Sequence, residues 1–405
     1  MTPTVIDNIS RFFTNVFDEQ NITLSGRCFS GFFGRPGVGN QLITNQYAFD
    51  ENIIRSDKRI SKMIPREDNF SQHLGSLIKT LRPGNYSKMS RNFPLCVEHF
   101  SISKADLETM APFESNPYPG PEIEQLRMRY YSMRSIKEIR RRSEDMCNIL
   151  AAQSILEGVQ DKIIDTSATE EQYTWHRNAS NFITVSTLWS DVTADILGDL
   201  GDSARQLHRQ GKITQNQPLI VGLSPSTMEL VKKNTEIKAQ ADNRRFVTVS
   251  VDPEMQIPTS HAFMIQNGWS FQAVVRTEGW TFYFYTTEDY YENDSSVNTS
   301  IMPNSKAFVT APMVQMDSIF GPPTTFDMSM DKIRKFQEWF GFNPMLPPAG
   351  TSTDNGTFRI IPNDAYHIIC ATDKWETSRE FAVQLAPVFK PTHTDGIVTL
   401  LGLTT

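Results

Sequence analysis

The chain has 405 residues, of which 39% are hydrophobic and 11% aromatic, and this length is enough for two or three domains with packed cores. The composition is that of an ordinary globular protein and contains no low-complexity tract. The formal net charge is −7, whereas a nucleic-acid reader is usually basic overall, so the charge argues against sequence-specific nucleic-acid recognition and leaves only loose contact with DNA.

The N-terminal residues and the cysteines indicate a cytosolic site of folding. Residues 1–17 have neither a basic start nor a continuous apolar run, and no stretch approaches the length that a bilayer span needs. The cysteines are widely scattered and form no CxxC pair, so their spacing predicts neither a zinc site nor a disulfide framework. We interpret all of them as small buried hydrophobic residues: Cys28, Cys96, Cys147 and Cys370.

The first 95 residues predict an arm followed by an extended hairpin. Residues 1–42 combine a short amphipathic stretch with a glycine-rich run, and we expect little core there. Strand-like pieces at 42–49 and 60–64, with a turn at Pro83 and Gly84, predict a long two-stranded excursion. A weakly hydrophobic hairpin of that size is unstable alone, so it should lie across a neighbouring subunit.

Charge is unevenly spread along the chain. Residues 55–91 hold nine basic and three acidic residues, a balance of +6, whereas residues 166–405 hold 18 basic and 26 acidic residues, a balance of −8. Opposite charges on two parts of one molecule favour head-to-tail self-association. We expect these basic residues of the excursion to contact another copy of the chain: Arg55, Lys58, Arg59, Lys62, Arg66, Lys79 and Arg82.

Residues 122–157 predict one long helix. Apolar residues recur there at helical three-and-four spacing, Pro121 suits the first turn, and Gly158 suits a left-handed cap. At 1.5 Å per residue such a helix is about 54 Å long, several times the mean of globular domains. We therefore expect a structural spine rather than part of an enzyme pocket.

The middle of this helix is rich in basic residues. Between positions 127 and 142 the only acid is Glu138. Two interpretations stay open for this face: contact with the phosphates of DNA, or ion pairs with acids of a neighbouring loop. We favour the second, because phosphate contacts accumulate affinity steeply with each cation. The expected contact residues are Arg127, Arg134, Lys137, Arg140, Arg141 and Arg142.

The remainder of the chain predicts an α/β segment followed by a strand-rich one. A strand at 184–188, a helix at 196–210, a strand at 218–223 and a helix at 226–233 suggest α/β packing. Strands then dominate, and a loop is expected at 340–356. The later predicted strands cover 273–276, 281–285, 306–310, 358–361, 366–370, 380–385 and 397–401.

Isolated chemical motifs do not form a convincing active site. Ser224 follows a strand and precedes a helix, as a hydrolase nucleophile would, but the second glycine of GxSxG is missing, so we favour an N-cap role for Ser224 or Ser226. The histidines lack i, i+4 spacing, which gives a zinc site little support. Acids at 288–294 lack the EF-hand pattern and favour a solvated turn, with weak calcium binding left open.

Several stretches, in one order, resemble the lambda-type major capsid proteins of tailed phages, often called the capsid protein E family. The long helix with its arginines and Gly158 resembles the family's spine helix and the glycine that ends it. Residues 1–42 and the loop at 320–356 depart from the family pattern, and the likeness covers roughly residues 90–405. The other matching stretches are Phe93-Pro94-Leu95 to Ile102, Leu188-Trp189-Ser190-Asp191 with Asp195-Ile196, Ile220-Val221-Gly222 with Leu230, Tyr283, Tyr285 and Tyr290 leading to residues 306–312, and Trp375, Pro387 and Thr394-Asp395 to Leu400.

The resemblance implies an α+β capsid fold of the HK type. Its parts would be an N-terminal arm (1–42), an E-loop (43–95), a P-domain with the spine helix (96–165), an A-domain (166–350), and strands (351–405) that return to the P-domain and close the A-domain. Trp189, Asp191 and Asp195 would be structural residues of the A-domain.

The function implied by the resemblance is that of a structural protein, not an enzyme. It would assemble as hexamers and pentamers into an icosahedral shell around the double-stranded DNA of a tailed phage. Its partners would be copies of itself, a scaffolding protein, the portal, optionally a decoration or cement protein, and loosely held DNA. Assembly in the host cytoplasm would place it in the virion capsid, with no membrane, catalytic residue, cofactor or metal ion.

Two alternatives remain at this level. An encapsulin-like shell would share the fold and enclose a protein cargo instead of a genome. A cytosolic serine hydrolase using Ser224 is a remote alternative from another class, because no set of acid, base and nucleophile stands out.

Overall fold

The computed structural model describes part of the chain, in stretches separated by gaps. Within the helix that begins at Pro121, side chains are described at positions 134 and 138 and from 141 onward. The described residues are 27–33, 41–42, 48–54, 86–92, 96–103, 121–161, 172–211, 213–215, 217–242, 246–248, 257–292, 297–312, 314, 316–320, 357–363, 366–372, 378–391 and 393–404.

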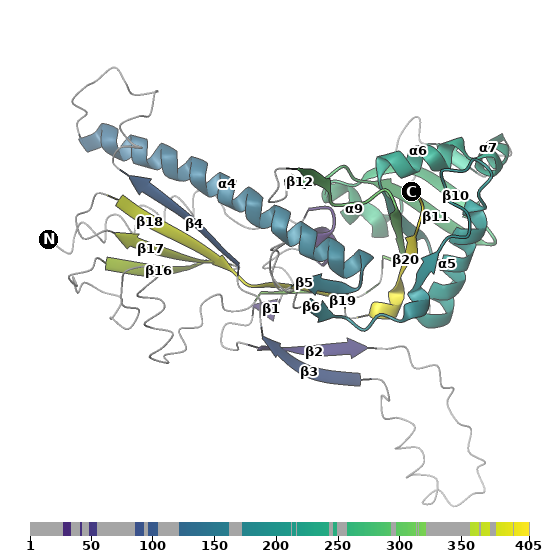
Figure 1. Ribbon diagram of the computed structural model, residues 1–405, viewed down its shortest axis with the longest axis horizontal. Helices are drawn as coiled ribbons and strands as arrows, with labels where there is room; N and C mark the ends of the chain where they lie inside the picture. Colours follow the sequence, from purple (N-terminus) through teal and green to yellow (C-terminus); the bar gives the residue numbers. More distant parts are fainter. Residues whose placement is uncertain are drawn as a thin grey trace, which may run out of the picture.

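The long helix predicted over residues 122–157 is α4 (Pro121–Leu156), which has 36 residues. Its first residue is proline, whose missing N–H has no helical partner at that position anyway. It is followed by Gly158, whose φ of 69° is a backbone conformation that favours glycine. Figure 1 shows α4 leaving the globular part of the molecule as a rod.

The globular part is built on a mixed sheet in which seven strands are described. β8 is central, pairing antiparallel with β14 on one side and parallel with β11 on the other. In order across the sheet the strands are β7 (Phe182–Thr184), β20 (Ile397–Leu401), β14 (Lys306–Thr310), β8 (Leu219–Leu223), β11 (Trp280–Thr286), β10 (Ser270–Thr277) and β9 (Phe246–Thr248).

The register at the centre of this sheet depends on one glycine. Gly222 in β8 lies opposite Phe308 in β14. A Cβ at Gly222 would lie 2.2 Å from the Phe308 ring, so the aromatic ring occupies the space that any larger residue would need. All five residues of β8 are buried, as a strand covered on both faces requires.

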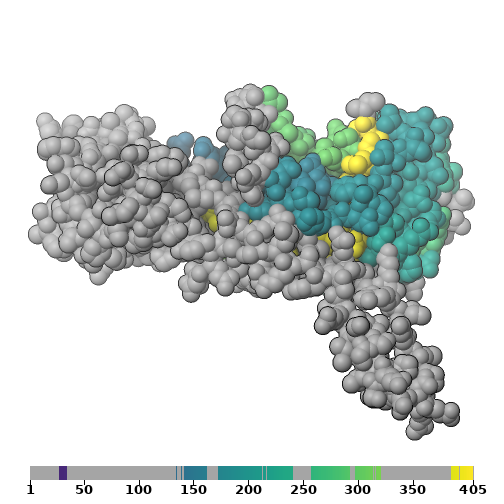
Figure 2. Space-filling view, turned by 60° about the horizontal axis from the view of Figure 1, so that its bottom comes forward, coloured from purple at the N-terminus to yellow at the C-terminus, as the bar shows by residue number. Residues whose placement is uncertain are grey.

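Helices cover the sheet, and their buried faces follow the predicted periodicity. In α5 (Ile196–Gly211) the residues Leu197, Leu200 and Leu207 are buried, and the helix was predicted at 196–210. In Figure 2 the teal surface of the stretch that carries α5 to α7 forms one end of the molecule. The other described helices and 3₁₀ turns are α6 (Pro225–Lys233), α7 (Thr235–Asp242), α9 (Ala262–Gln266), η1 (Ser30–Phe33), η3 (Ala179–Asn181), η4 (Thr259–His261) and η5 (Thr394–Gly396).

One predicted strand is misplaced. The strand was expected at 184–188, but β7 ends at Thr184. The N–H of Val185 still donates to the Leu401 carbonyl of β20 at 3.1 Å, and after Val185 the chain leaves β20. The following residues form a loop that leads to α5, and all of them are exposed except the buried Trp189 and Ala194.

A second sheet joins segments far apart in the sequence. β18 (Ser378–Leu385) pairs antiparallel with β4 (Cys96–Ser103) along its whole length. The sheet continues through β17 (Tyr366–Thr372) to β16 (Thr357–Asn363), and these strands correspond to those predicted near the C-terminal end. In Figure 1 this sheet projects from the globular part in the same direction as α4.

The remaining described strands form small sheets. A three-stranded sheet has the order β1 (Gln41–Leu42), β15 (Met316–Phe320) and β19 (Pro387–Pro391). The two-stranded sheets are β2 (Ala48–Ile54) with β3 (Tyr86–Asn92), β5 (Val159–Asp161) with β6 (Gln172–Thr174), and β12 (Tyr290–Glu292) with β13 (Asn298–Ser300). This mixture of separate helices and mostly antiparallel strands confirms the α+β class.

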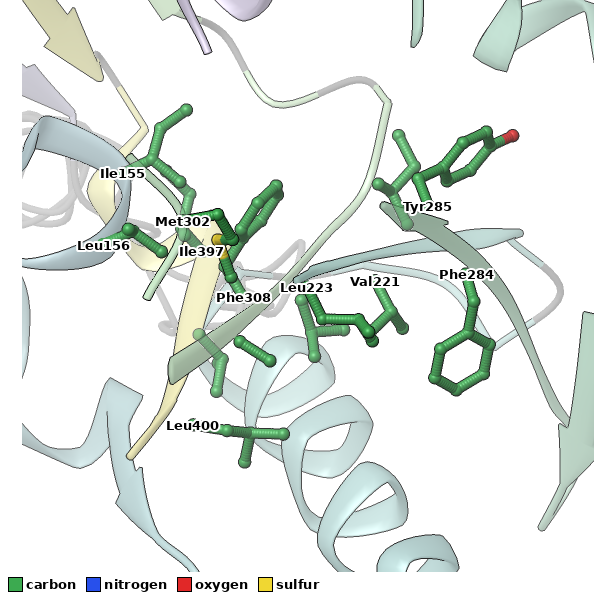
Figure 3. Close-up of a cluster of buried hydrophobic side chains, with 14 of the residues drawn as sticks. Ile155, Leu156, Val221, Leu223, Phe284, Tyr285, Met302, Phe308, Ile397 and Leu400 are labelled. Atoms are coloured by element: carbon green, nitrogen blue, oxygen red, sulfur yellow. The ribbon is translucent and has the colours of Figure 1, made fainter. Parts of the chain in front are cut away.

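One hydrophobic cluster unites the end of α4 with the seven-stranded sheet. Figure 3 shows Ile155 and Leu156 of α4 beside Ile397 and Phe308 of the sheet, with Leu400 of the same cluster on the other side of its strand. Each of these side chains is at most 4% exposed. The rod is therefore anchored to the body through its C-terminal turns.

The described cysteines agree with their interpretation as buried hydrophobic residues. Cys28 and Cys147 are both buried as free thiols. Burial raises the pKa of Cys28 to about 12, despite an opposing hydrogen bond with Thr287, so this thiol stays protonated at neutral pH. The side chains of Cys96 and Cys370 lie outside the described ones.

Candidate assembly surfaces

The charged face of α4 carries ion pairs within the helix. Glu138 accepts hydrogen bonds from Arg141 at 2.7 Å and from Arg142 at 3.2 Å. The hydrogen bond from Arg141 is the main cause that holds the pKa of Glu138 below its usual range. Both arginines are more than half exposed, so they remain accessible to a partner. The expected arginine face is thus partly neutralised by its own helix.

A second carboxylate, Asp145, extends this charge chain to the N-terminal part of the protein. Its Oδ2 accepts from Arg141 at 3.2 Å, while its Oδ1 accepts from Arg27. Arg27 also lies 3.5 Å from the nearly buried Glu144. Burial raises the pKa of Asp145, and the two arginines act against that rise.

The other expected contacts on α4 are described unevenly. Arg134 is exposed. Arg127, Lys137 and Arg140 lie on α4, but their side chains are outside the described ones.

The expected contact residues of the excursion also lie outside the described residues. The structure shows the base of this segment, where β2 and β3 pair antiparallel from Ala48 opposite Asn92 to Ile54 opposite Tyr86. The predicted piece at 60–64 and the residues Arg55, Lys58, Arg59, Lys62, Arg66, Lys79 and Arg82 fall in the gap between these strands.

Residues Arg27–Phe33, here called the N-terminal plug, pack into the body. The expectation of little core in residues 1–42 is wrong for this stretch, because Phe29 and Phe33 are 0% and 2% exposed. The Phe29 ring meets Trp269 edge-on at 5.2 Å between centroids, and the Phe33 ring meets Phe389 at 5.4 Å. Aromatic residues with specific partners therefore make a core inside the predicted arm.

Hydrogen bonds fix the plug to three separate elements. Asn148 of α4 accepts from the backbone N–H groups of Phe29 at 2.7 Å and Ser30 at 3.3 Å. The Trp269 indole donates to the Cys28 carbonyl at 2.7 Å, and the Ser318 hydroxyl of β15 donates to the Phe33 carbonyl at 3.1 Å. The plug thus joins α4, the segment before β10 and the three-stranded sheet.

The C-terminal end of α4 is capped by a buried arginine. Arg177 donates to the carbonyls of Ser154, at 3.0 Å, and Ile155, and to the Thr399 hydroxyl at 2.8 Å. Burial lowers the pKa of Arg177 to about 9, which leaves it charged at neutral pH. A cation at this position stabilises the negative end of the helix dipole.

The residues expected to be structural in the A-domain surround the start of α5. Trp189 is 1% exposed and its indole donates to Asp199 at 2.9 Å. Asp195 caps α5 by accepting from the Gly198 N–H at 2.8 Å. Asp191 accepts from the backbone N–H and the hydroxyl of Thr193 in the exposed loop.

Ser224 has the geometry of a helix cap. Its Oγ accepts from the Thr227 N–H at 3.2 Å and lies 2.9 Å from the Thr227 hydroxyl. The residue is 3% exposed. A nucleophile needs access to substrate and a neighbouring base, and the hydrogen bonds given for Ser224 include no histidine, lysine or carboxylate.

Other candidate sites gain no support from the geometry. Among the described residues no group of three or more histidine, cysteine or acidic side chains could hold a metal ion. Asp289 of the predicted acidic turn accepts from the Asn148 amide at 3.0 Å, and Glu292 and Asp294 have no described side chains. No helix in the described stretches is long and apolar enough to cross a membrane.

Comparison with known proteins gives likeness at the level of solved structures only. No protein-family model and no curated protein matches the chain. A putative capsid protein of a prophage from E. coli CFT073 is similar with a TM-score of 0.48 and 12% identity, over 93% of both chains. The capsid of Cyanophage P-SCSP1u has a TM-score of 0.38 and 9% identity, over 90% of this chain and 86% of that one.

A third similar structure is the holo-SrpI encapsulin complex from Synechococcus elongatus PCC 7942. Its TM-score is 0.35 and its identity 9%, over 90% of this chain and 86% of that one. Because these TM-scores lie below 0.5, the function has to be inferred from the geometry of this chain.

Proposed function

We propose that the protein is the major capsid subunit of a tailed phage, which assembles as hexamers and pentamers into an icosahedral shell around double-stranded DNA. It is a structural protein and not an enzyme. The observation that carries the proposal is the rod α4, which extends from a compact body and is held to that body only near its C-terminal end among the described side chains.

A rod of this length offers a long surface to other molecules. At 1.5 Å per residue the 36 residues of α4 span about 54 Å, whereas the hydrogen bonds and ion pairs between its described side chains and the body begin at Glu144. The preceding part carries exposed arginines at 134, 141 and 142. Copies of the same chain, whose segment 166–405 has a balance of −8, are the natural partners.

The extended hairpin supports the same proposal. β2 and β3 form an isolated pair among the described strands, and a two-stranded sheet is marginal without further support. The segment that they enclose carries most of the +6 charge of residues 55–91. A hairpin that lies over a neighbouring subunit would gain packing contacts, and its basic residues would gain acidic partners.

The finer assignments follow from the sequence resemblance. We assign the chain to the lambda-type family, with the arm at 1–42, the E-loop at 43–95, the P-domain at 96–165, the A-domain at 166–350 and the closing strands at 351–405. β18 beside β4 and β20 beside β14 support a C-terminal segment shared between both domains. A scaffolding protein, the portal and an optional decoration protein complete the partners, with assembly in the host cytoplasm.

Negative-stain electron microscopy of the purified protein, with and without a co-expressed scaffolding protein, tests the proposal. Closed icosahedral particles are the expected result. A compact monomer that forms no particles at any concentration, with or without scaffold, would overturn it.

An encapsulin-like cargo shell is the second candidate within the same fold class. The nucleic-acid content of particles made during infection separates the two, because a phage shell contains genomic DNA and a cargo shell contains an enzyme. The remote hydrolase alternative would require an activity that is lost in Ser224→Ala, and the capping geometry of Ser224 argues against it.

A further inference from the structure

Two attachments, one after the other along α4, connect the rod to the body. The first is the C-terminal end, where Leu150, Ile155 and Leu156 are buried in the main cluster and Arg177 binds the last carbonyls. Because most side chains of this end are buried, it acts as a fixed point. Lys306 adds an ion pair to Glu157, just beyond the helix, at 2.7 Å.

The second attachment is the N-terminal plug. It contacts α4 two to three turns before the fixed end, through Arg27 with Glu144 and Asp145 and through the two N–H groups bound by Asn148. Glu144, Cys147 and Asn148 are 5%, 4% and 0% exposed. The rings of Phe29 and Phe33 pack against Trp269 and Phe389, so the plug contacts both α4 and the body.

The plug has little freedom to shift in its seat. A Cβ at Gly31 would lie 2.2 Å from the Asn267 side chain, so the backbone of the plug approaches the body closely. The rings of Phe32 and Phe308 lie 5.5 Å apart in an edge-on contact. Because the plug packs closely between the body and α4 near Asn148, it constrains the direction in which α4 leaves the body.

Small movements at the plug become large ones at the far end of the rod. Asn148 lies seven residues from Ile155, or about 10 Å along the helix, whereas Pro121 lies about 50 Å from it. A displacement at Asn148 is therefore amplified about fivefold at Pro121.

We propose that the N-terminal plug is a prop that sets the direction of α4 relative to the seven-stranded sheet, and that Arg27 and Asn148 hold it in place. With the plug in place, an unassembled subunit holds its rod at one defined angle. The inference rests on the proposed function only in the use made of that angle, because the angle of the rod would set how neighbouring subunits of a shell meet.

The test measures the angle directly on unassembled, full-length subunits, so that it does not depend on shell formation. Nitroxide labels on non-natural keto side chains replace Arg134 on α4 and Lys233 on α6, both exposed, which avoids the native cysteines. Pulsed electron spin resonance gives the distribution of distances between the labels. We compare the parent with Arg27→Gln/Asn148→Ala, in which the polar contacts between the plug and α4 are lost while those from Trp269 and Ser318 remain.

We expect the double variant to widen this distribution at least twofold, while hydrogen exchange at Phe29 and Ser30 becomes at least tenfold faster. The matched control is Leu207→Ala, which opens a cavity under α5 without touching the plug and should leave the width unchanged. Faster exchange at Phe29 and Ser30 with an unchanged distance distribution would overturn the prop. Unchanged exchange would overturn the role of the two anchors. If the double variant fails to fold, the single variant Arg27→Gln, which removes only the ion pairs of Arg27 with Glu144 and Asp145, is measured in the same way.

Discussion

Arg177 is the residue on which the end of α4 depends most. Its guanidinium donates to two backbone carbonyls and one hydroxyl, and its charge lies 5.0 Å from the centroid of the Phe182 ring. Without the guanidinium of Arg177 these buried acceptors have no donor from that side chain, which lowers the free energy of unfolding by more than the loss of one exposed hydrogen bond would.

We therefore predict that Arg177→Met lowers the free energy of unfolding by about 3 kcal/mol, because buried carbonyl acceptors each cost about 1–3 kcal/mol when unpaired. Urea titration followed by circular dichroism measures the change. The control Arg209→Met, at an exposed position on α5, should stay within about 0.5 kcal/mol of the parent. Equal effects of the two substitutions would contradict the cap.

His261 gives the protein a pH dependence of known sign. It is 0% exposed, its Nδ1 lies 3.0 Å from the Tyr285 hydroxyl, and burial lowers its pKa to about 4. In the unfolded chain His261 takes up a proton near pH 6.5, whereas in the folded chain its pKa is about 4. The contribution of His261 to the free energy of unfolding is therefore complete above pH 6.5 and is lost as the pH falls from 6.5 to 4.

The predicted slope from this residue is about 1.4 kcal/mol per pH unit within that window. Urea titrations at pH 7, 6 and 5 measure the slope in the parent and in His261→Gln, which cannot take up the proton. We expect the difference in stability between parent and variant to narrow as the pH falls. A constant difference across the range would show that His261 does not titrate there.

At the scale of elements, Gly158 after α4 and Gly402 after β20 form a matched pair of glycines. Gly158 and Gly402 both have positive φ, 69° and 74°. A Cβ at Gly158 would lie 3.3 Å from the Arg177 Cβ, whereas at Gly402 the nearest atom, in Thr184, is 3.7 Å away. Both substitutions carry the conformational cost of alanine at positive φ, and only the first also disturbs the cap.

We predict that Gly402→Ala lowers the free energy of unfolding by about 1 kcal/mol and that Gly158→Ala lowers it by about 2 kcal/mol. Thermal and urea unfolding of both variants give the comparison. If Gly402→Ala lowers the free energy of unfolding more than Gly158→Ala does, the close contact of Gly158 with Arg177 does not contribute to stability.

Elements with a strong local pattern could be predicted from the sequence. α4, α5 and β8 lie within one residue of their predicted bounds, because periodicity and flanking proline or glycine define them. α7 was missed although its signal is present, since the side chain of Asn234 accepts from the N–H groups of Glu236 and Ile237 at the start of the helix.

Other elements depend on residues too distant for any local pattern. β19 begins and ends with proline, and its Phe389 N–H donates to the side chain of Gln160 instead of a neighbouring strand. The plug is fixed by Asn148, 119 residues beyond Phe29, and by Ser318, 285 residues beyond Phe33. The count of charges on α4 from the sequence covered positions 127 to 142 and found Glu138. It missed Asp145, which lies past this basic stretch, and Arg27, which comes from the arm.

At the scale of the whole molecule, the exposed arginines of α4 are predicted to act between subunits. Replacing Arg140, Arg141 and Arg142 by glutamate removes the pairs of Arg141 and Arg142 with Glu138 and of Arg141 with Asp145, which contribute about 0.5 kcal/mol each, so the fold should persist. We expect a soluble monomer that forms no shells, as measured by size-exclusion chromatography and electron microscopy. Normal shells from this variant would refute the electrostatic role.

The excursion is predicted to be needed for assembly and not for folding. Deleting residues 55–85 and joining Ile54 to Tyr86 through a two-residue turn keeps the pairing of β2 with β3. The variant should show the circular dichroism and unfolding midpoint of the parent and form no particles. Closed particles would count against an intersubunit loop.

The place of β20 in the seven-stranded sheet has a consequence for synthesis on the ribosome. β20 lies between β7 and β14, so residues 182–184 and 306–310 have no strand between them until residue 401 has been translated and has left the exit tunnel. Until then the edge of β14 is open to pairing with other chains. The nascent polypeptide therefore carries an open strand edge until residue 401 has emerged from the ribosome, and the sheet can close only after that point.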